Sequence, residues 1–117
     1  MALTFSLVDT WDDGQRIHVA GTVAASGSYS TGGDALDLSQ FPILASTQPP
    51  ISGTAWMDGL AAYDYVFAPG AALNNGKMKV FEQGSGAGPF AELAAGAYPS
   101  AITGDSITLY AIFKKLQ

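Results

Sequence analysis

Short stretches in which apolar residues occupy every second position recur along the whole chain, and Gly, Pro, Asn or Asp bounds most of them. Alternation with a period of two places successive side chains on opposite faces of an extended backbone, so the pattern predicts β-strands. The two clearest examples are 62–67 and 106–114. Both faces of 106–114 are apolar, which predicts that this strand lies at the centre of a sheet.

Turn signals between these stretches indicate how the strands connect. Asn75-Gly76 stands between 62–67 and a further stretch, 77–83, and predicts that the two pair antiparallel. Gly21 lies within an alternating stretch and predicts a bulge or a close neighbour there. The tetrapeptide at 31–34, TGGD, fits the tip of a hairpin. Strands with looser alternation are predicted at 3–8, 16–24, 35–38 and 53–60.

Helical periodicity is almost absent from the chain. The only stretch that favours a helical turn is 89–95, PFAELAA, because proline suits the first helical position and Gly96 would end the turn. About seven short strands in 117 residues predict one all-β domain spanning 1–117. We expect a single-domain antiparallel β-sandwich or barrel, jelly-roll-like, with at most one short helix near 89–95.

Composition narrows the classes of function. The net charge is −5 with only five basic residues, so no nucleic-acid partner is expected. The chain has no cysteine, which excludes disulfides, thiolate metal sites and a cysteine nucleophile. No signal peptide or membrane span is predicted, so no membrane partner is expected. Charged residues make up 13% of the chain, against about 25% in an average domain, which suits either a surface covered by neighbours or a small alanine-rich domain.

The segment DTWDDGQRIHV brings three aspartates close in sequence to the only histidine, His18, and raises the possibility of a metal or acid–base site. Strand spacing of about 3.3 Å per residue argues against such a site, because Asp12 and Asp13 fall in a turn several positions before His18. We predict a structural turn in which both carboxylates accept hydrogen bonds from turn amides and Gly14 adopts a left-handed conformation. Trp11 is expected to hold the turn against the domain, with His18 half-buried on a strand face.

Other catalytic patterns are missing from the sequence. Nothing brings Glu82 and Glu92, the only glutamates, to the separation that a glycosidase needs. No G-x-S-x-G motif presents a serine to His18. The glycine-rich stretch 84–88 lacks a nearby lysine and precedes Pro89, so it favours a loop tip over a phosphate-binding loop. We therefore predict a protein that is not an enzyme, with no catalytic residue, no metal and no cofactor.

Aromatic residues gather on one face of the stretch 62–67. Three interpretations are open: an ordinary core face, a subunit interface, or a platform on which sugars stack. The ordinary core face is the leading interpretation, and a subunit interface comes second because interfaces are enriched in Tyr, Trp and Phe. The candidate protein-interface residues are Trp56, Tyr63, Tyr65 and Phe67.

The run TWDDGQRIHVAGTVAASGSYSTGGDALDLS (10–39) resembles a recurring segment of small structural proteins of tailed phages. Their approximate pattern is W-D-D-G-K-R-hydrophobic-H-V-x-G-T-hydrophobic-A-x-S-G-x-Y-x-T-G-G-D-x-L, and Gln15 replaces its basic residue. The segments 63–81 and 94–115 are similar to parts of the same proteins, so the resemblance covers most of the chain. The matching positions are Trp11, Asp12, Asp13, Gly14, Arg16, His18, Val19, Gly21, Thr22, Ala24, Ser26, Gly27, Tyr29, Thr31, Gly32, Gly33, Asp34 and Leu36.

The resemblance implies a virion structural protein of the capsid decoration (cement) class. Such a protein is synthesised in the host cytoplasm, binds the exterior of the assembled phage head and bridges subunits of the major capsid protein. Decoration proteins often form trimers, so a homotrimer is expected, and the role carries no catalytic residues. The alternative is a carbohydrate-binding or host-adhesion β-sandwich module of a phage tail or fibre.

Overall fold

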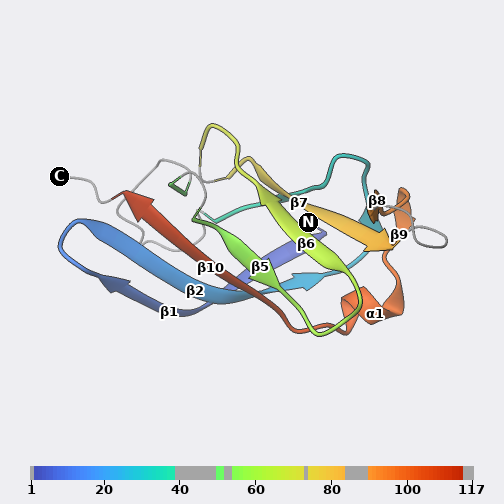
Figure 1. Ribbon diagram of the computed structural model, residues 1–117, viewed down its shortest axis with the longest axis horizontal. Helices are drawn as coiled ribbons and strands as arrows, with labels where there is room; N and C mark the ends of the chain where they lie inside the picture. The colour runs from blue at the N-terminus through green and yellow to red at the C-terminus, as the bar shows by residue number, and fades with distance from the viewer. Residues whose placement is uncertain (1, 39–49, 52–53, 73, 84–89, 115–117) are drawn as a thin grey trace.

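The computed structural model describes residues 2–38, 50–51, 54–72, 74–83 and 90–114, and it contains antiparallel strands and one short helix (Figure 1). The all-β class is therefore confirmed. The described part of the chain contains no helix that is long and apolar enough to cross a membrane. The elements are β1 Leu3–Asp12, β2 Arg16–Ala25, β3 Ser28–Tyr29, β4 Asp34–Leu36, β5 Trp56–Asp58, β6 Asp64–Ala68, β7 Gly76–Gln83, β8 Phe90–Glu92, β9 Gly96–Ala97, α1 Ser100–Thr103 and β10 Ile107–Lys114.

Two four-stranded sheets form the sandwich. The first has the order β1-β2-β10-β5, and the second has the order β4-β7-β6 with β8 also paired to β7. Strands β3 and β9 form a small third sheet. The inward faces of both main sheets contribute to one hydrophobic core, with Phe5 and Phe113 from the first sheet and Met78 and Val80 from the second. In the first sheet the last strand, β10, lies between β2 and β5.

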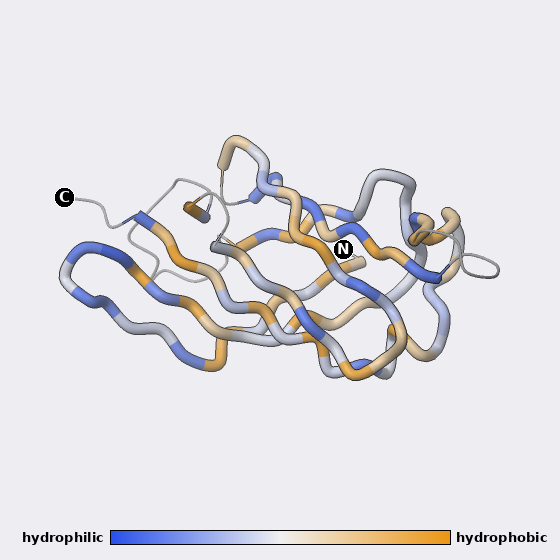
Figure 2. The backbone as a smooth tube through the Cα atoms, viewed as in Figure 1, coloured by the Kyte–Doolittle hydropathy of each residue, from blue (hydrophilic) through white to orange (hydrophobic). Residues whose placement is uncertain are grey.

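Strand β10 occupies the central position that its sequence predicts. It pairs with β2 on one side and with β5 on the other. Ile107, Leu109, Ala111 and Phe113 are all buried in the core, whereas the alternate residues face outward. Figure 2 shows this mostly apolar strand turning hydrophilic where it ends at Lys114. The alternation therefore defines an inner and an outer face of the first sheet.

The predicted hairpin of 62–67 with 77–83 is also confirmed. Strand β6 pairs antiparallel with β7, and Tyr65 lies opposite Val80. The glycine of the turn signal, Gly76, begins β7 under the ring of Phe67, where a Cβ atom would clash with the ring. Glycine is therefore required there by close packing, and not by a left-handed backbone.

A β-bulge in β1 decides which side chains reach the outer face of the first sheet. The register with β2 shifts between Leu7 and Asp9, so that Val8 is an extra residue. One extra residue reverses the alternation that follows it, because side chains in a strand repeat every two positions. Trp11 consequently lies opposite the outward-facing His18 instead of pointing into the core.

Gly21 lies at the bulge, and both predicted explanations for it are observed. It pairs with Leu7, the last residue before the register shift. A Cβ atom at Gly21 would also lie 2.5 Å from the ring of Phe5, closer than any packed carbon contact. The buried Phe5 ring therefore fills the space that a side chain at this position would need.

Two local predictions were wrong. Residues 90–92 form β8 rather than a helix, because the backbone of β7 pairs with them and Leu93 N donates to Val80 O at 2.9 Å. A helix of one or two turns has an unfavourable nucleus and does not compete with an available strand. The short helix is instead α1, while Pro89 lies outside the described residues. The turn at 31–34 is not a hairpin tip, because β3 pairs with β9 and β4 pairs with β7.

Candidate functional site: an aromatic cluster on the outer sheet face

Four near-parallel rings, one from each strand of the first sheet, gather on its outer face. Trp11 stacks on His18 with ring centroids 5.0 Å apart and on Tyr110 at 6.0 Å. Trp56 stacks on Tyr110 at 5.3 Å, with ring planes 11° apart. We call Trp11, His18, Tyr110 and Trp56 the aromatic cluster. Its two indoles remain 45% and 51% exposed, so roughly half of each stays open to a partner.

Strand pairing explains why these rings meet. Trp11 lies directly opposite His18, and Tyr110 lies directly opposite Trp56. His18 pairs with Ile112, which places Tyr110 two residues away on the same face of the neighbouring strand. Aromatic pairs across strands contribute roughly 0.5–1.5 kcal/mol beyond burial. The cluster is thus a consequence of sheet order and of the bulge in β1.

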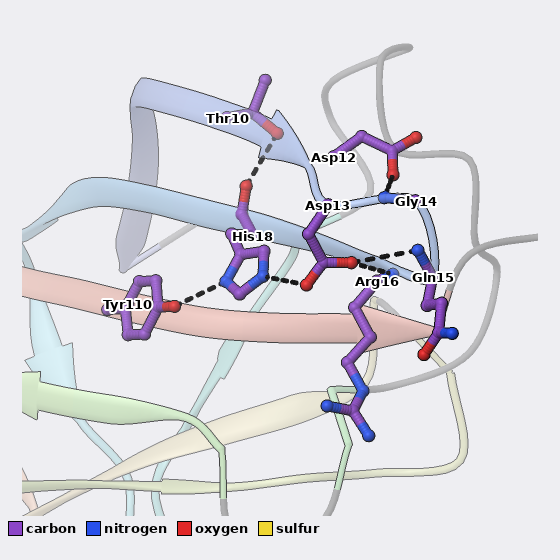
Figure 3. Close-up of polar contacts among 8 residues, drawn as sticks. All are labelled: Thr10, Asp12, Asp13, Gly14, Gln15, Arg16, His18 and Tyr110. Atoms are coloured by element: carbon purple, nitrogen blue, oxygen red, sulfur yellow. Dashed lines mark hydrogen bonds and ion pairs between the residues drawn. The ribbon is translucent and has the colours of Figure 1, made fainter.

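His18 is held through both ring nitrogens (Figure 3). Nε2 lies 2.9 Å from Asp13 Oδ2, and Nδ1 lies 2.6 Å from the Tyr110 hydroxyl. A carboxylate only accepts, so Nε2–H donates to Asp13; Nδ1 of the neutral ring then accepts the Tyr110 O–H. The imidazole and phenol rings have centroids 6.0 Å apart and planes 20° apart, and Trp11 stacks on both. These contacts position the rings and occupy both imidazole nitrogens.

The turn before His18 has the predicted structure. Asp12 Oδ1 accepts a hydrogen bond from Gly14 N at 2.7 Å, and Gly14 has a φ of 98°. Asp13 Oδ1 accepts from Gln15 N at 3.0 Å and from Arg16 N at 2.8 Å. The hydrogen bond with His18, followed by these two backbone bonds, holds the pKa of Asp13 well below its usual value.

The structure corrects one expectation about this segment. Asp13 and His18 were expected to lie several strand residues apart, whereas their side chains are in contact. The hairpin pairs Asp12 with Ile17, and Asp13 N donates to Arg16 O, so Asp13 lies across from a residue only two positions before His18. Across the part of the chain described, no group of three His, Cys, Asp or Glu residues comes together as a possible metal site. Trp11 does stabilise the turn, but through His18 on the outer face rather than through the core.

The structure divides the four predicted interface residues. Trp56 is exposed within the aromatic cluster, while Tyr63 and Phe67 are half-buried against the core. Tyr65 is 3% exposed, and its hydroxyl donates to Asp105 Oδ2 at 2.7 Å, so it cannot contact a partner in the folded chain. The interpretation as a core face therefore holds for Tyr63, Tyr65 and Phe67. The interface role of Trp56 stays a prediction.

Sequence reasoning missed Trp11 and Tyr110 as members of the exposed site. The alternation of 106–114 does place Tyr110 on the face opposite the core residues. The missing information was the strand order, which brings β10 beside β2, and the bulge, which turns Trp11 outward. Both depend on tertiary packing.

Comparisons with family models, with curated proteins and with solved structures found no match to this chain. The aromatic cluster offers exposed ring surface on the outer face of the first sheet. Such a surface is typical of contact with another molecule.

Proposed function

We propose that this chain is a structural virion protein, a capsid decoration (cement) protein that binds the outer surface of the assembled phage head. It bridges neighbouring subunits of the major capsid protein and so stabilises the shell. The observation that carries the proposal is the aromatic cluster, in which Trp11 and Trp56 are each about half exposed. Exposed tryptophan and tyrosine side chains are the residues that most often dominate binding energy at protein interfaces.

The segment with the clearest phage resemblance also builds much of this face. Trp11, Asp13 and His18 all belong to the WDDGxRxHV part of the signature. Asp13 joins the turn to His18, and His18 supports Trp11. The signature is thus accounted for by residues that shape an exposed surface, which supports a role in assembly.

Low charge and repetition also favour this role. Only 13% of residues are charged, so burying much of the surface against a partner carries a small desolvation penalty. We propose a homotrimer on the capsid exterior, made in the host cytoplasm and acting without a cofactor or nucleic acid. Many copies on one particle add avidity, so each contact can be individually weak.

Purified particles from the phage or prophage that encodes the chain test the proposal. We expect the protein on the particle exterior at symmetry-related positions, and a trimer mass in solution. Trp11→Ala should lower the number of bound copies, whereas Val66→Ala, on the outer face of the second sheet, should not. A monomer in solution that is absent from the particles would contradict the proposal.

A second candidate is the carbohydrate-binding or host-adhesion module, favoured by the exposed indole of Trp56. Sugars stack on open aromatic faces, and half of this side chain is open. Tyr65 does not contribute, because it is buried. A glycan array would decide: sugar binding that Trp56→Ala abolishes and Val66→Ala preserves would favour this candidate, and the absence of any binding would remove it.

A further inference from the structure

The outer face of the first sheet is hollowed next to the aromatic cluster. The hollow has a volume of about 170 Å³ and is lined by Asp58, Gly59, Leu60, Ser106 and Thr108. Pockets for drug-sized ligands measure about 300–1,000 Å³. The smaller volume here suits a single long side chain of a partner.

Trp56 borders this hollow. Trp56 and Asp58 are two residues apart on β5, so their side chains project from the same face. Trp56 pairs with Tyr110 while Asp58 pairs with Thr108, which sets ring and hollow side by side across two strands. One face of the indole stacks on Tyr110, and the exposed half of Trp56 remains available.

The charges around the hollow are negative. Asp58 Oδ1 accepts from Gly59 N at 2.9 Å, and its Oδ2 has no hydrogen-bond partner among the residues described. Asp105 lies beside the hollow and accepts from Leu60 N at 2.8 Å. The nearest lysine of β10, Lys114, is six positions beyond Thr108, about 20 Å along the strand at 3.3 Å per residue.

We infer that Trp56 and this hollow dock an arginine side chain of a partner protein. The guanidinium stacks on the open face of Trp56 and donates to the Asp58 carboxylate, while the aliphatic stem packs on Leu60, which is 90% exposed. Arginine suits the site better than lysine, because its planar group stacks and forms paired hydrogen bonds at once. The inference rests on the proposed function only for the identity of the partner, the capsid surface.

A peptide titration tests the chemistry of the site without particles. In the Trp11→Phe variant, Trp56 is the only tryptophan, so its fluorescence reports on the site directly. Hexa-arginine should give a saturable change and bind about fivefold more tightly than hexa-lysine. Adding Asp58→Asn should weaken hexa-arginine about fivefold. Adding Asp64→Asn, which removes an exposed carboxylate from β6, is the matched control and should change little.

Equal binding of the two peptides, or equal losses in the two Asp→Asn variants, would show general charge attraction and overturn the inference. A glycan whose binding Trp56→Ala abolishes, or a dimer of the chain that buries Trp56, would assign a different occupant and overturn it as well.

Binding to particles separates this inference from the proposed function. If wild type and Asp64→Asn decorate particles while Asp58→Asn does not, the arginine site is supported. If all three decorate equally, the inference fails and the proposed function stands. If none decorates but hexa-arginine binding keeps the expected pattern, the inference stands and the proposed function fails.

Discussion

Asp13 connects the β1–β2 turn to the aromatic cluster with its two carboxylate oxygens. Oδ1 accepts the amides of Gln15 and Arg16, and Oδ2 accepts from His18 Nε2. The turn therefore fixes the tautomer of His18, and the tautomer in turn orients the Tyr110 hydroxyl. One exposed residue thus links local turn chemistry to the shape of the outer face.

Asp13→Asn should keep the hydrogen bonds that hold the turn but change the hydrogen bond to His18. An asparagine Oδ1 can still accept the turn amides, but its side-chain NH2 would face the Nε2–H of His18 and exclude that tautomer. We expect the ¹⁵N shifts of the imidazole to report the other tautomer, in which Nδ1–H donates to the Tyr110 hydroxyl. Asp12→Asn should leave the imidazole as it is. An unchanged His18 tautomer in Asp13→Asn would contradict the assignment.

Gly21→Ala tests the close packing at the bulge. The added Cβ would meet the Phe5 ring and the Ser6 carbonyl, so we expect a loss of about 1–3 kcal/mol in the free energy of unfolding. Urea denaturation measures the loss. In a Phe5→Leu background, Gly21→Ala should lower the free energy of unfolding by less than it does in the wild type, because the added Cβ no longer meets the Phe5 ring. A midpoint equal to wild type for Gly21→Ala would refute the packing argument.

At the scale of elements, the bulge at Val8 controls which face of β1 carries Trp11. Deleting Val8 removes the extra residue and leaves Trp11 opposite His18, because Leu7 and Asp9 already pair with the consecutive residues Gly21 and Ala20. We expect this deletion variant to retain the near-UV circular dichroism of the stacked rings. Val8→Thr keeps the extra residue and should retain the signal, because Val8 is 70% exposed. Deleting Thr10 instead would place Trp11 opposite the buried Val19 and should weaken the signal. A signal that is lost in the Val8 deletion but kept in the Thr10 deletion would contradict this role of the bulge.

Alternation predicted the strands and the β6–β7 hairpin because both depend on local pattern and turn chemistry. A helical turn was predicted at 89–95 from its leading proline and from Gly96, because the edge of β7, which pairs with Phe90–Glu92 as β8, cannot be seen from that segment alone. The candidate site could not be predicted from local pattern alone. The aromatic residues on one face of 62–67 are evident in the sequence, yet Tyr65 faces inward. The exposed rings instead come from the four strands of the first sheet. Strand order and register are tertiary properties, so the cluster could not be assembled from the sequence.

At the scale of the whole molecule, three tyrosine–carboxylate hydrogen bonds among the described residues join distant parts of the chain. Burial, followed by the bond to Glu92, raises the pKa of Tyr29 to about 12. Burial alone would raise the pKa of Asp105, but hydrogen bonds from Tyr65 and nearby amides lower it overall. The pairs are Tyr29 with Glu92, Tyr65 with Asp105 and Tyr98 with Asp34.

These pairs predict the dependence of stability on pH. Glu92 and Asp105 have lowered pKa values, so they stabilise the fold above the ordinary carboxyl range, and this stabilisation is lost as pH falls through and below it. The raised pKa of Tyr29 contributes stability that is complete below pH 10 and lost as pH rises toward about 12. Urea midpoints should therefore fall at both extremes. Asp105→Asn should flatten the acid side, and a midpoint independent of pH between 2 and 5 would contradict the linkage.

The central claim is that the outer face of the β1-β2-β10-β5 sheet docks on a phage capsid, and a particle reconstruction tests it most directly. The particles should come from the phage or prophage that encodes the chain. We predict density for the protein at symmetry-related positions on the shell exterior, with Trp11 and Trp56 in contact with the major capsid protein. Particles without the protein, or with this sheet face turned to solvent, would contradict the account.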